Sequence, residues 1–482
     1  MTPVAKVGGL GDVLMGLTRE LSWKGHETLA IIPNYGVVDR HWLTPTGRVD
    51  TFDTCFDGMT HRATVTYYTL YNDITVGLLD TEWGYWKQQQ KIYGNNDEVA
   101  SFLFFSRAVA DWLVQTRRRP NILHVHDWQT AIIPLICRSL DRTKDLASMR
   151  SILTVHNFEY QGCCHWGDIA RVGLFPLNFP DPSILQDPWH PCLNIIKAGI
   201  LSVDLVTTVS PTYSQEVKTA EGGRGLHHVL SSLGDKFLGV LNGLDYAFWN
   251  PEIDPFLFER FSLSLGMNRI AKAKQENKKQ LFQQLGLHVC DDRPLVASIT
   301  RLVPQKGIYL IQNAFFRAES LGMQCVLLGS VADAGTEPLF RALDTELRRK
   351  GNGAVLLMSD EMMAHRLYGA ADIFVVPSLF EPCGLTQLIA LKYGAIPVVR
   401  RTGGLADTVV DVDGGASAQS NGFVFDQPDQ PGFDSALLRA LILFSRNRDR
   451  WGEYMLRGMK QDFSWHNPGM KYLELYQRLH KL

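Results

Sequence analysis

A glutamate in a glycine-containing loop is the first residue whose type and setting indicate chemistry. Glu381 lies in the loop Phe380-Glu381-Pro382-Cys383-Gly384-Leu385, between an expected strand and an expected helix. Backbone N–H groups at the start of that helix would hold phosphate or sugar oxygens, and Gly384 would let a ligand approach closely. A carboxylate at this place would stabilise positive charge developing on a sugar ring. The other interpretation is that Glu381 caps the helix, and the motif alone does not decide between the two.

Two cations lie on another loop in the same half of the chain. Arg301 and Lys306 follow an apolar run and precede a helical pattern. Two positive charges beside a helix N-terminus make a natural site for a diphosphate. The alternative is a solvated basic surface loop, but the position between a strand and a helix favours the diphosphate site.

The first half of the chain has polar residues at comparable places. In open parallel sheets, ligands bind beyond the carboxyl ends of the strands, and these residues fall there. Each is weak evidence by itself: a glycine pair is common in turns, and a single histidine is equally typical of a hydrogen-bonded core. The residues are Lys6 with Gly8 and Gly9, His126 with Asp127, His156 with Asn157, and Asn242.

The cysteines and paired aspartates do not indicate a metal site. None of the eight cysteines belongs to a CxxC pair, so a zinc site of that kind is not expected. The adjacent Cys163 and Cys164 would be either a redox-active pair or two ordinary thiols in a loop, and the second interpretation is favoured. Asp411 and Asp413 lie in a glycine-flanked loop without other ligand-like neighbours, which indicates a surface position.

Length and composition narrow the class of protein. A chain of 482 residues is expected to form two large domains. Charged residues make up 20% of the chain and nearly cancel to a net charge of -2, so neither nucleic acid nor a membrane surface is an expected partner. No apolar run is long enough for a bilayer span. No targeting segment is recognised, and no strand precedes the loop at Lys6, so we expect the chain to be a truncated form of a longer protein.

The elements that must position these residues are clearest in the second half. Short apolar runs, typical of strands buried on both faces of a sheet, alternate with longer helical patterns. Repeated βα units of this kind predict a parallel, doubly wound sheet. The expected strands are 295–299, 325–328, 354–358, 373–376 and, as the last, 396–399, and the expected helices are 307–321, 339–349, 361–370 and 385–393.

The first half shows the same pattern less regularly. The segment 63–79 is expected to be a hairpin that turns at Asn72-Asp73. The boundary is expected near residue 250, which divides the chain into an N-terminal domain, 1–250, and a C-terminal domain, 251–482. The other expected elements are a helix at 11–24 and strands at 28–32, 122–126, 152–156 and 205–209.

Taken together, the motifs resemble the signatures of starch synthases and bacterial glycogen synthases, glycosyltransferase family 5. The matching segments follow the family's order over nearly the whole chain. Within the family, 156–162 and 219–226 (TAEGGRGL) look most like the plant and algal class IV starch synthases. The matching segments are 6–13 (KVGGLGDV), 126–128 (HDW), 154–157 (TVHN) with 160–162 (YQG), 241–243 (LNG), 301–307 (RLVPQKG), 380–387 (FEPCGLTQ) and 401–409 (RTGGLADTV).

This resemblance implies a GT-B fold, an α/β architecture of two facing Rossmann-like, doubly wound domains with a cleft between them. It implies retaining transfer of glucose from ADP-glucose to a growing α-1,4-glucan, without a metal or other cofactor. It places Glu381, Asp127 and His156 among the catalytic residues. The residues implied to bind substrate are Lys6, Gly8, Gly9, Asn157, Asn242, Arg301, Lys306, Cys383, Gly384, Leu385 and Thr386.

The chain also departs from the family's pattern. The strand before Lys6 and the long coiled-coil extension of class IV proteins are absent, Ser359 stands where a tyrosine usually stacks on adenine, and Ser101-Phe102 replaces the commoner Arg-Phe. An alternative function is therefore a catalytically weak glucan-binding scaffold in starch-granule initiation. In either case the resemblance implies a plastid location, in the stroma of a chloroplast or amyloplast.

Overall fold

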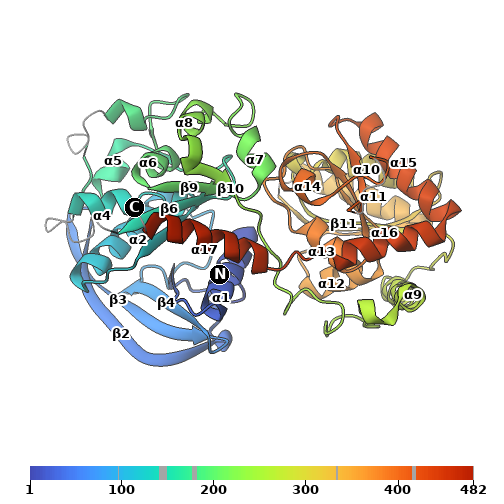
Figure 1. The fold of residues 1–482 in the computed structure, drawn as a ribbon, viewed down its shortest axis with the longest axis horizontal. Helices are drawn as coiled ribbons and strands as arrows, with labels where there is room; N and C mark the ends of the chain where they lie inside the picture. The colour runs from blue at the N-terminus through green and yellow to red at the C-terminus, as the bar shows by residue number, and fades with distance from the viewer. Residues whose placement is uncertain (96, 141–148, 176–181, 333–334, 415–418, 481–482) are drawn as a thin grey trace. The chain divides into compact units, whose positions relative to one another are not determined.

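The computed structural model describes residues 1–95, 97–140, 149–175, 182–332, 335–414 and 419–480. The chain forms two compact units (Figure 1). The first unit consists of Met1–Gly243 with Trp465–Leu482, and the second of Leu244–Ser464. The chain first passes from one unit to the other between Gly243 and Leu244, close to the expected boundary at residue 250. The end of the chain, which was expected in the second domain, belongs instead to the first unit.

The second unit is built on one parallel sheet of six strands, ordered β13-β12-β11-β14-β15-β16. The parallel, doubly wound arrangement expected from the βα repeats is confirmed. The expectation that 396–399 ends the series was wrong, because a further strand pairs with β15. The bounds are β11 (Leu295–Leu302), β12 (Gln324–Val331), β13 (Gly353–Leu356), β14 (Ile373–Val376), β15 (Ile396–Arg400) and β16 (Phe423–Phe425).

Apolar side chains alternate between the two faces of this sheet and build a core on each. In β14, Phe374 and Val376 join one core, while Ile373 and Val375 join the other. Burial on both faces explains why the strands are continuous apolar runs. One face is covered by α9 (Met267–Gln284), α12 (Glu361–Ala370) and α13 (Thr386–Lys392), the other by α10 (Ile308–Phe316), α11 (Thr336–Arg349) and α15 (Gln430–Arg446), and α16 (Arg448–Lys460) contributes to both cores.

The first unit contains two four-stranded sheets. The order β10-β9-β6-β5 is parallel throughout, whereas the order β1-β4-β3-β2 includes antiparallel pairs. The expected hairpin is confirmed as β3 and β4, with Asn72 in the left-handed region at φ 68°. Strand β2 was not expected, because much of it is exposed and polar. The bounds are β1 (Leu29–Pro33), β2 (Leu43–Phe56), β3 (Met59–Leu70), β4 (Ile74–Thr81), β5 (Ile122–His126), β6 (Arg150–Val155), β9 (Leu205–Thr208) and β10 (Phe237–Gly239).

The sheet β1-β4-β3-β2 is mixed, because β1 pairs with β4 in parallel whereas β3 pairs antiparallel with both β4 and β2. A further two-stranded ribbon joins β7 (Cys163–Cys164) to β8 (Leu193–Asn194). The helices of the unit are α1 (Gly9–Trp23), α2 (Glu98–Gln115), α3 (Asp127–Thr130), α4 (Ile133–Leu140), α5 (Trp166–Ala170), α6 (Ile195–Ser202), α7 (Pro211–Glu216), α8 (His227–Ser232) and α17 (His466–His480). Short 3-10 turns occur in this unit at Arg40–Trp42, Pro182–Leu185 and Gly234–Lys236. In the second unit they occur at Leu263–Leu265 and Pro304–Lys306.

Helix α17 returns the chain to the first unit and packs beside α1 (Figure 1). Trp465 and Tyr472 share a buried cluster with Val13 and Leu17 of α1. A Cβ atom at Gly16 would lie 1.8 Å from the Trp465 indole nitrogen, so only glycine allows this close packing. Sequence patterns do not reveal the return, because it depends on contacts between the two ends of the chain.

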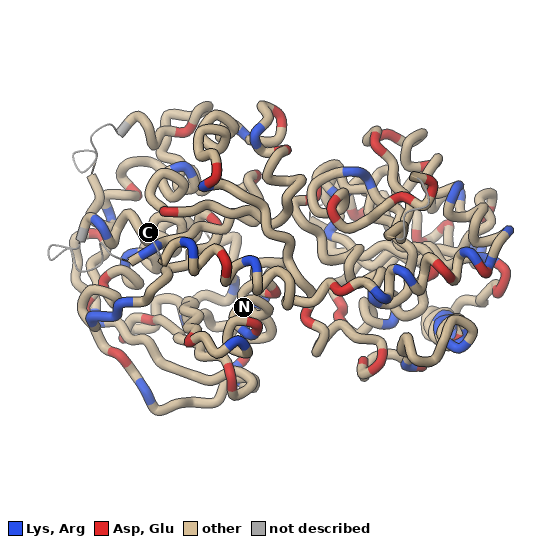
Figure 2. The backbone as a smooth tube through the Cα atoms, viewed as in Figure 1, with Lys and Arg blue, Asp and Glu red and all other residues tan. Residues whose placement is uncertain are grey.

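Charge is mixed over both units, with acidic and basic residues interspersed along the backbone (Figure 2). Within the described part of the chain, no helix has the length and apolar character that crossing a membrane would need.

Candidate active site

In the second unit the structure brings Lys306 and Glu381 together. The Nζ atom of Lys306 lies 2.5 Å from Oε2 of Glu381, and the hydroxyl of Ser378 donates to the same oxygen at 2.8 Å. Glu381 is only 7% exposed. The cap interpretation is not supported, because α13 begins at Thr386 and its N-cap position, Leu385, accepts no side-chain cap bond. The carboxylate instead faces the loop expected to bind phosphate.

Direct contacts between two loops hold this pair in place. The Leu379 N–H donates to the Gln305 carbonyl at 2.7 Å, and the Gln305 side chain donates to the Phe380 carbonyl at 3.2 Å. Gly307 follows Lys306 with φ 65°, and a Cβ there would lie 2.1 Å from the Pro377 carbonyl oxygen. Glycine is thus required twice over, for the backbone conformation and for the close approach.

The glycine pair Gly403-Gly404 supports the Glu381 loop from behind. The Gly404 N–H donates to the Glu381 carbonyl at 3.1 Å. A Cβ on Gly403 would lie 2.0 Å from that carbonyl oxygen, and one on Gly404 would lie 2.1 Å from the Cys383 carbonyl oxygen. The motif 401–409 was matched in sequence but given no role, and the structure assigns it the positioning of this loop.

The remaining residues expected in this unit surround the same loop. Cys383 is buried, and Gly384 has a positive φ of 73°. The side chain of Gln387 donates to the Cys383 and Gly384 carbonyls at 3.1 and 2.9 Å, which fixes the turn into α13. Arg301 lies near the end of β11, is exposed, and makes no ion pair with any residue in the described ranges. Its guanidinium is therefore available to an anion.

In the first unit the carboxyl ends of β5 and β6 bring Asp127 and His156 together. The Asp127 carboxylate accepts a hydrogen bond from the His156 backbone N–H at 2.6 Å. The His156 ring lies 3.1 Å, nitrogen to nitrogen, from the ring of His126. Asp127 adopts φ 53°, a left-handed conformation in which non-glycine residues are uncommon and which turns its side chain toward the neighbouring strand.

Desolvation sets the charge of these groups. It raises the pKa of Asp127 to about 7, although the backbone N–H groups of His156 and Asn157 oppose the shift. Burial lowers the pKa of His156 to about 3 and also lowers that of His126, where the neighbouring His156 adds to the effect. At neutral pH both rings are uncharged, so they act as hydrogen-bonding groups and not as cations.

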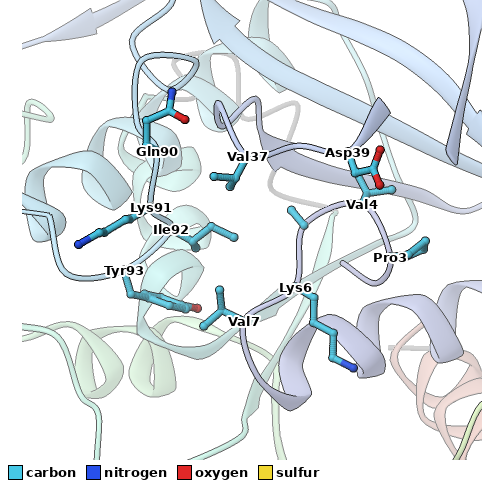
Figure 3. Close-up of a pocket in the computed structure, with 11 residues that line it drawn as sticks. Pro3, Val4, Lys6, Val7, Val37, Asp39, Gln90, Lys91, Ile92 and Tyr93 are labelled. Atoms are coloured by element: carbon cyan, nitrogen blue, oxygen red, sulfur yellow. The ribbon is translucent and has the colours of Figure 1, made fainter. Parts of the chain in front are cut away.

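Lys6 forms an ion pair with a residue of the helix that follows it. Its Nζ lies 3.0 Å from Oδ1 of Asp12. Lys6 borders a cavity of about 530 Å³ that is also lined by Val7, Ile92 and Tyr93, but its amine points away from Ile92 and Tyr93 (Figure 3). The structure therefore places Lys6 at the edge of a cavity, with its charge directed to the helix that follows.

The glycines at the start of α1 leave open space. Gly8 precedes the helix with φ 79°, and a Cβ at Gly8 or Gly9 would meet no described atom within 4 Å. Asn242 is 9% exposed, and its side-chain oxygen has no hydrogen-bond partner among the described residues. A buried acceptor without a partner is a candidate for ligand contact, because leaving it unsatisfied costs free energy.

Tyr93 is a candidate that the sequence analysis missed. It lines the cavity beside Lys6, and its pKa is raised first by burial and then by the charge of Asp127. Tyr93 thus lies within electrostatic reach of the Asp127 group. The available signal was an aromatic residue followed by glycine and asparagine in a polar segment, which is too common to single out.

The two segments that resemble class IV starch synthases contact each other. Glu159 and Arg224 form an ion pair at 2.7 Å, and the Gln161 side chain donates to the Arg224 carbonyl at 3.0 Å. Asn157 accepts from the Glu159 backbone N–H at 3.0 Å, so part of its amide is used in shaping the loop. The segment 219–226 therefore supports the loop that follows His156.

The chain matches two protein-family models and a solved structure. Residues 1–232 match the family model described as starch synthase catalytic domain, and residues 270–456 match glycosyl transferases group 1. The catalytic domain of starch synthase IV from Arabidopsis thaliana, solved bound to ADP and acarbose, superposes with a TM-score of 0.93 at 39% identity, covering 100% of this chain and 98% of that one.

Two curated relatives differ in length. The chain is 40% identical to a probable starch synthase 4, chloroplastic/amyloplastic, of Arabidopsis thaliana over 99% of its own length but only 46% of the relative. It is 39% identical to a glycogen synthase of Protochlamydia amoebophila over 99% of its length and 97% of the relative. The chain thus spans about half of the plant relative and nearly all of the bacterial one.

The fold and the two matching family models define a glycosyltransferase of the GT-B fold. Identity of this extent over nearly the whole of a bacterial relative narrows the class further. The chain belongs to the family of starch synthases and bacterial glycogen synthases.

Proposed function

We propose that this protein transfers glucose from ADP-glucose to the non-reducing end of an α-1,4-glucan with retention of the anomeric configuration. Family membership supports the reaction class, and the structural relative bound to ADP and acarbose supports the two kinds of substrate. The observation that carries the proposal is the 2.5 Å contact between Lys306 and the buried Glu381, which joins the expected diphosphate loop to the expected sugar loop.

The roles of the residues follow from their surroundings. Arg301 and Lys306 neutralise the donor diphosphate, because Arg301 lies near the end of β11 and Lys306 lies in the 3-10 turn that follows it. A diphosphate is a dianion or more at neutral pH, so both cations attract it. Glu381 stabilises positive charge on the glucosyl ring as the bond to the diphosphate breaks. Gly384, Leu385 and Thr386 offer backbone groups at the start of α13.

The first unit has hydrogen-bonding groups that are suited to a sugar. His156 is uncharged, so its ring can hydrogen-bond a sugar hydroxyl without adding positive charge. Asp127 orients the His156 backbone, and Asn242 offers an acceptor that no described residue uses. The acceptor's 4-hydroxyl attacks from the face that the diphosphate leaves, and the departing diphosphate takes up the hydroxyl proton. Because lysine and arginine neutralise the diphosphate, the transfer requires no metal.

The test is an assay of the purified protein with ADP-glucose and a malto-oligosaccharide in the presence of a chelator. We expect release of ADP together with extension of the oligosaccharide by single glucose units. A folded protein that neither consumes nor binds ADP-glucose contradicts the proposal. Calorimetry with each substrate distinguishes the alternative scaffold function, for which binding of glucan without ADP-glucose is the expected result.

A plastid location is the finer part of the proposal. The plant relative is named chloroplastic/amyloplastic, and the contact between Glu159 and Arg224 joins two segments that resemble class IV starch synthases. The bacterial relative is almost as similar as the plant relative, so sequence identity does not distinguish a plastid protein from a bacterial one. Immunolocalisation in the source cells decides: signal in the plastid stroma is expected, and signal confined to the cytosol contradicts it.

A further inference from the structure

Three side chains with metal-binding atoms gather in the first unit, apart from the residues assigned to glucosyl transfer. The sulfurs of Cys163 and Cys192 and a carboxylate oxygen of Asp187 lie within 4.8 Å of one another. The Cys163 sulfur is 3.4 Å from Oδ2 of Asp187. Cys163 is exposed and Asp187 is 6% exposed, so the cluster is buried on one side and open on the other.

The backbone holds these atoms in place before any ligand arrives. Oδ1 of Asp187 accepts from the N–H groups of Trp189 and His190 at 2.9 and 3.0 Å, and Oδ2 accepts from the Asn194 amide at 2.9 Å. The Asp187 N–H donates to the Cys192 carbonyl at 2.8 Å. Pairing of β7 with β8 then sets Cys163 opposite Asn194. Strand pairing or turns therefore fix the backbone at all three residues that carry metal-binding atoms.

The Asp187 carboxylate lies beside both thiols, and the Cys163 sulfur donates to its Oδ2. Lys197 lies within electrostatic reach of Asp187, but its Nζ donates to the Gln186 carbonyl. Among the described residues, Asp187 accepts hydrogen bonds from backbone N–H groups, the Asn194 amide and the Cys163 thiol, and from no Lys, Arg or His side chain. A cation can therefore bind beside the carboxylate.

We propose that Cys163, Asp187 and Cys192 bind one zinc ion. In tetrahedral zinc sites the bonds are about 2.3 Å to sulfur and about 2.1 Å to oxygen, which places the two kinds of donor about 3.5 Å apart. The observed 3.4 Å between the Cys163 sulfur and the Asp187 oxygen meets this requirement without rearrangement. Each thiol releases its proton to solvent on binding, and water on the exposed side completes the coordination.

The zinc ion would steady a loop and take no part in glucosyl transfer. Asn194 donates both to Asp187 and to the side-chain oxygen of Gln161. Gln161 in turn donates to the Phe158 carbonyl at 2.9 Å and to the Arg224 carbonyl. Hydrogen bonds therefore run from the proposed metal ligand to the segment after His156. The site is independent of the proposed reaction, and its test does not depend on activity.

The experiment measures cobalt binding to the reduced, chelator-treated full chain. Co²⁺ replaces zinc in tetrahedral sites, and thiolate ligands give it charge-transfer absorption that carboxylates and water do not. We expect one Co²⁺ per chain with this absorption, displaced by one equivalent of zinc. The Cys163→Ser variant tests the site without disturbing the core, because this side chain is exposed. It should lose the charge-transfer bands wholly or in large part and bind about tenfold or more weakly.

Cys290→Ser is the matched control, since Cys290 is also an exposed free cysteine but belongs to the second unit. This variant should bind cobalt like the parent chain. Binding should weaken as the pH falls from about 8 to about 6, because protons compete for the thiols. The proposal is overturned if the parent shows no thiolate absorption, if Cys163→Ser retains it in full, or if Cys290→Ser loses it. It is equally overturned if Cys163 and Cys192 form a disulfide and the reduced form takes up no metal.

Discussion

Single residues at the candidate site combine burial with charge. Glu381 is buried yet hydrogen-bonded to Lys306 and Ser378, so its charge is compensated. Within the described part of the chain, Asp127 receives hydrogen bonds from backbone groups alone, and desolvation raises its pKa to about 7. Two carboxylates in different surroundings are thereby suited to different roles. Glu381 is paired with a cation, whereas desolvation brings Asp127 close to the midpoint of its titration at neutral pH.

Replacing Glu381 by glutamine should abolish turnover with little loss of stability. The glutamine amide retains an oxygen that accepts from Lys306 and Ser378, but it lacks the charge that steadies the glucosyl ring. We expect kcat for glucose transfer to fall by about 10²–10³-fold or more, with nearly unchanged thermal unfolding. Glu474→Gln, at an exposed position of α17, is the control and should retain activity. Equal activity in Glu381→Gln would remove this residue from the mechanism.

Asp127→Asn should stabilise the fold increasingly as the pH rises. Because the folded pKa is raised above the ordinary 3.8, the ionised carboxylate destabilises the native state. That cost is absent below about pH 4, grows as the pH rises, and is complete above about pH 7. We expect the free energy of unfolding of the variant to exceed that of the parent by about 1–3 kcal/mol at about pH 8 and to converge with it near pH 4.

Chemical denaturation at both pH values measures this difference. Protonation of His156 at low pH affects both proteins and cancels. Asp235→Asn, at an exposed position of a 3-10 turn, should show no such gain. A constant difference between Asp127→Asn and the parent over this pH range would show that desolvation does not govern Asp127.

Loops at the carboxyl ends of strands are the elements that assemble the site. In the second unit three loops meet: the one after β11 with Lys306, the one after β14 with Glu381, and the one after β15 with Gly403-Gly404. Neighbouring parallel strands end at one edge of the sheet, so residues 75 positions apart in sequence come into contact. The loops contact one another through backbone atoms, which is why glycines recur in them.

Gly404→Ala should disrupt the Glu381 loop. The added methyl group would lie 2.1 Å from the Cys383 carbonyl oxygen, and a backbone atom cannot move aside as a side chain would. We expect a loss of about 1–3 kcal/mol in unfolding free energy and a clear fall in kcat. Gly167→Ala in α5 is the control, because a Cβ there meets no described atom within 4 Å. Parental stability and activity in Gly404→Ala would contradict the assigned positioning role.

The whole molecule consists of two units with separate cores, and the chain passes between them twice. The second unit is a continuous segment, whereas the first needs the returning helix α17. Tyr476 in α17 hydrogen-bonds His124 in β5 at 2.8 Å, and Tyr472 is fully buried. The first unit therefore depends on residues at both ends of the sequence.

Fragments should behave differently for this reason. Residues 244–464 expressed alone should unfold cooperatively, because both of their sheet faces are already covered. Residues 1–243 alone should lack a sharp transition, since they lose Trp465 and the buried face of α17. Joining residues 465–482 to this fragment through a flexible linker should restore the transition. Thermal unfolding followed by circular dichroism measures this, and a sharp transition in unlinked 1–243 would contradict it.

Much of the architecture was predictable from local sequence. The doubly buried strands are apolar runs, and their positions in the second unit agree with the structure within a few residues, as do α12, α13 and the hairpin at Asn72. Strands β2 and β16 were missed, because one is polar and largely exposed and the other has only three residues. A sequence pattern shows how apolar residues are spaced along the chain. It therefore identifies the helices and strands that bury a continuous or regularly spaced set of apolar side chains.

By itself, the sequence determined the family, the order of the motifs and the identity of the residues at the strand ends. Only the tertiary structure decided which of them meet: Glu381 with Lys306, Lys6 with Asp12, Cys163 with Asp187 and Cys192, and α17 with α1. The physical reason is the sequence distance over which each kind of interaction acts. Propensity and periodicity act over a few residues, whereas each of these contacts except that of Lys6 with Asp12 joins segments separated by many residues and forms only when the sheets and helices pack.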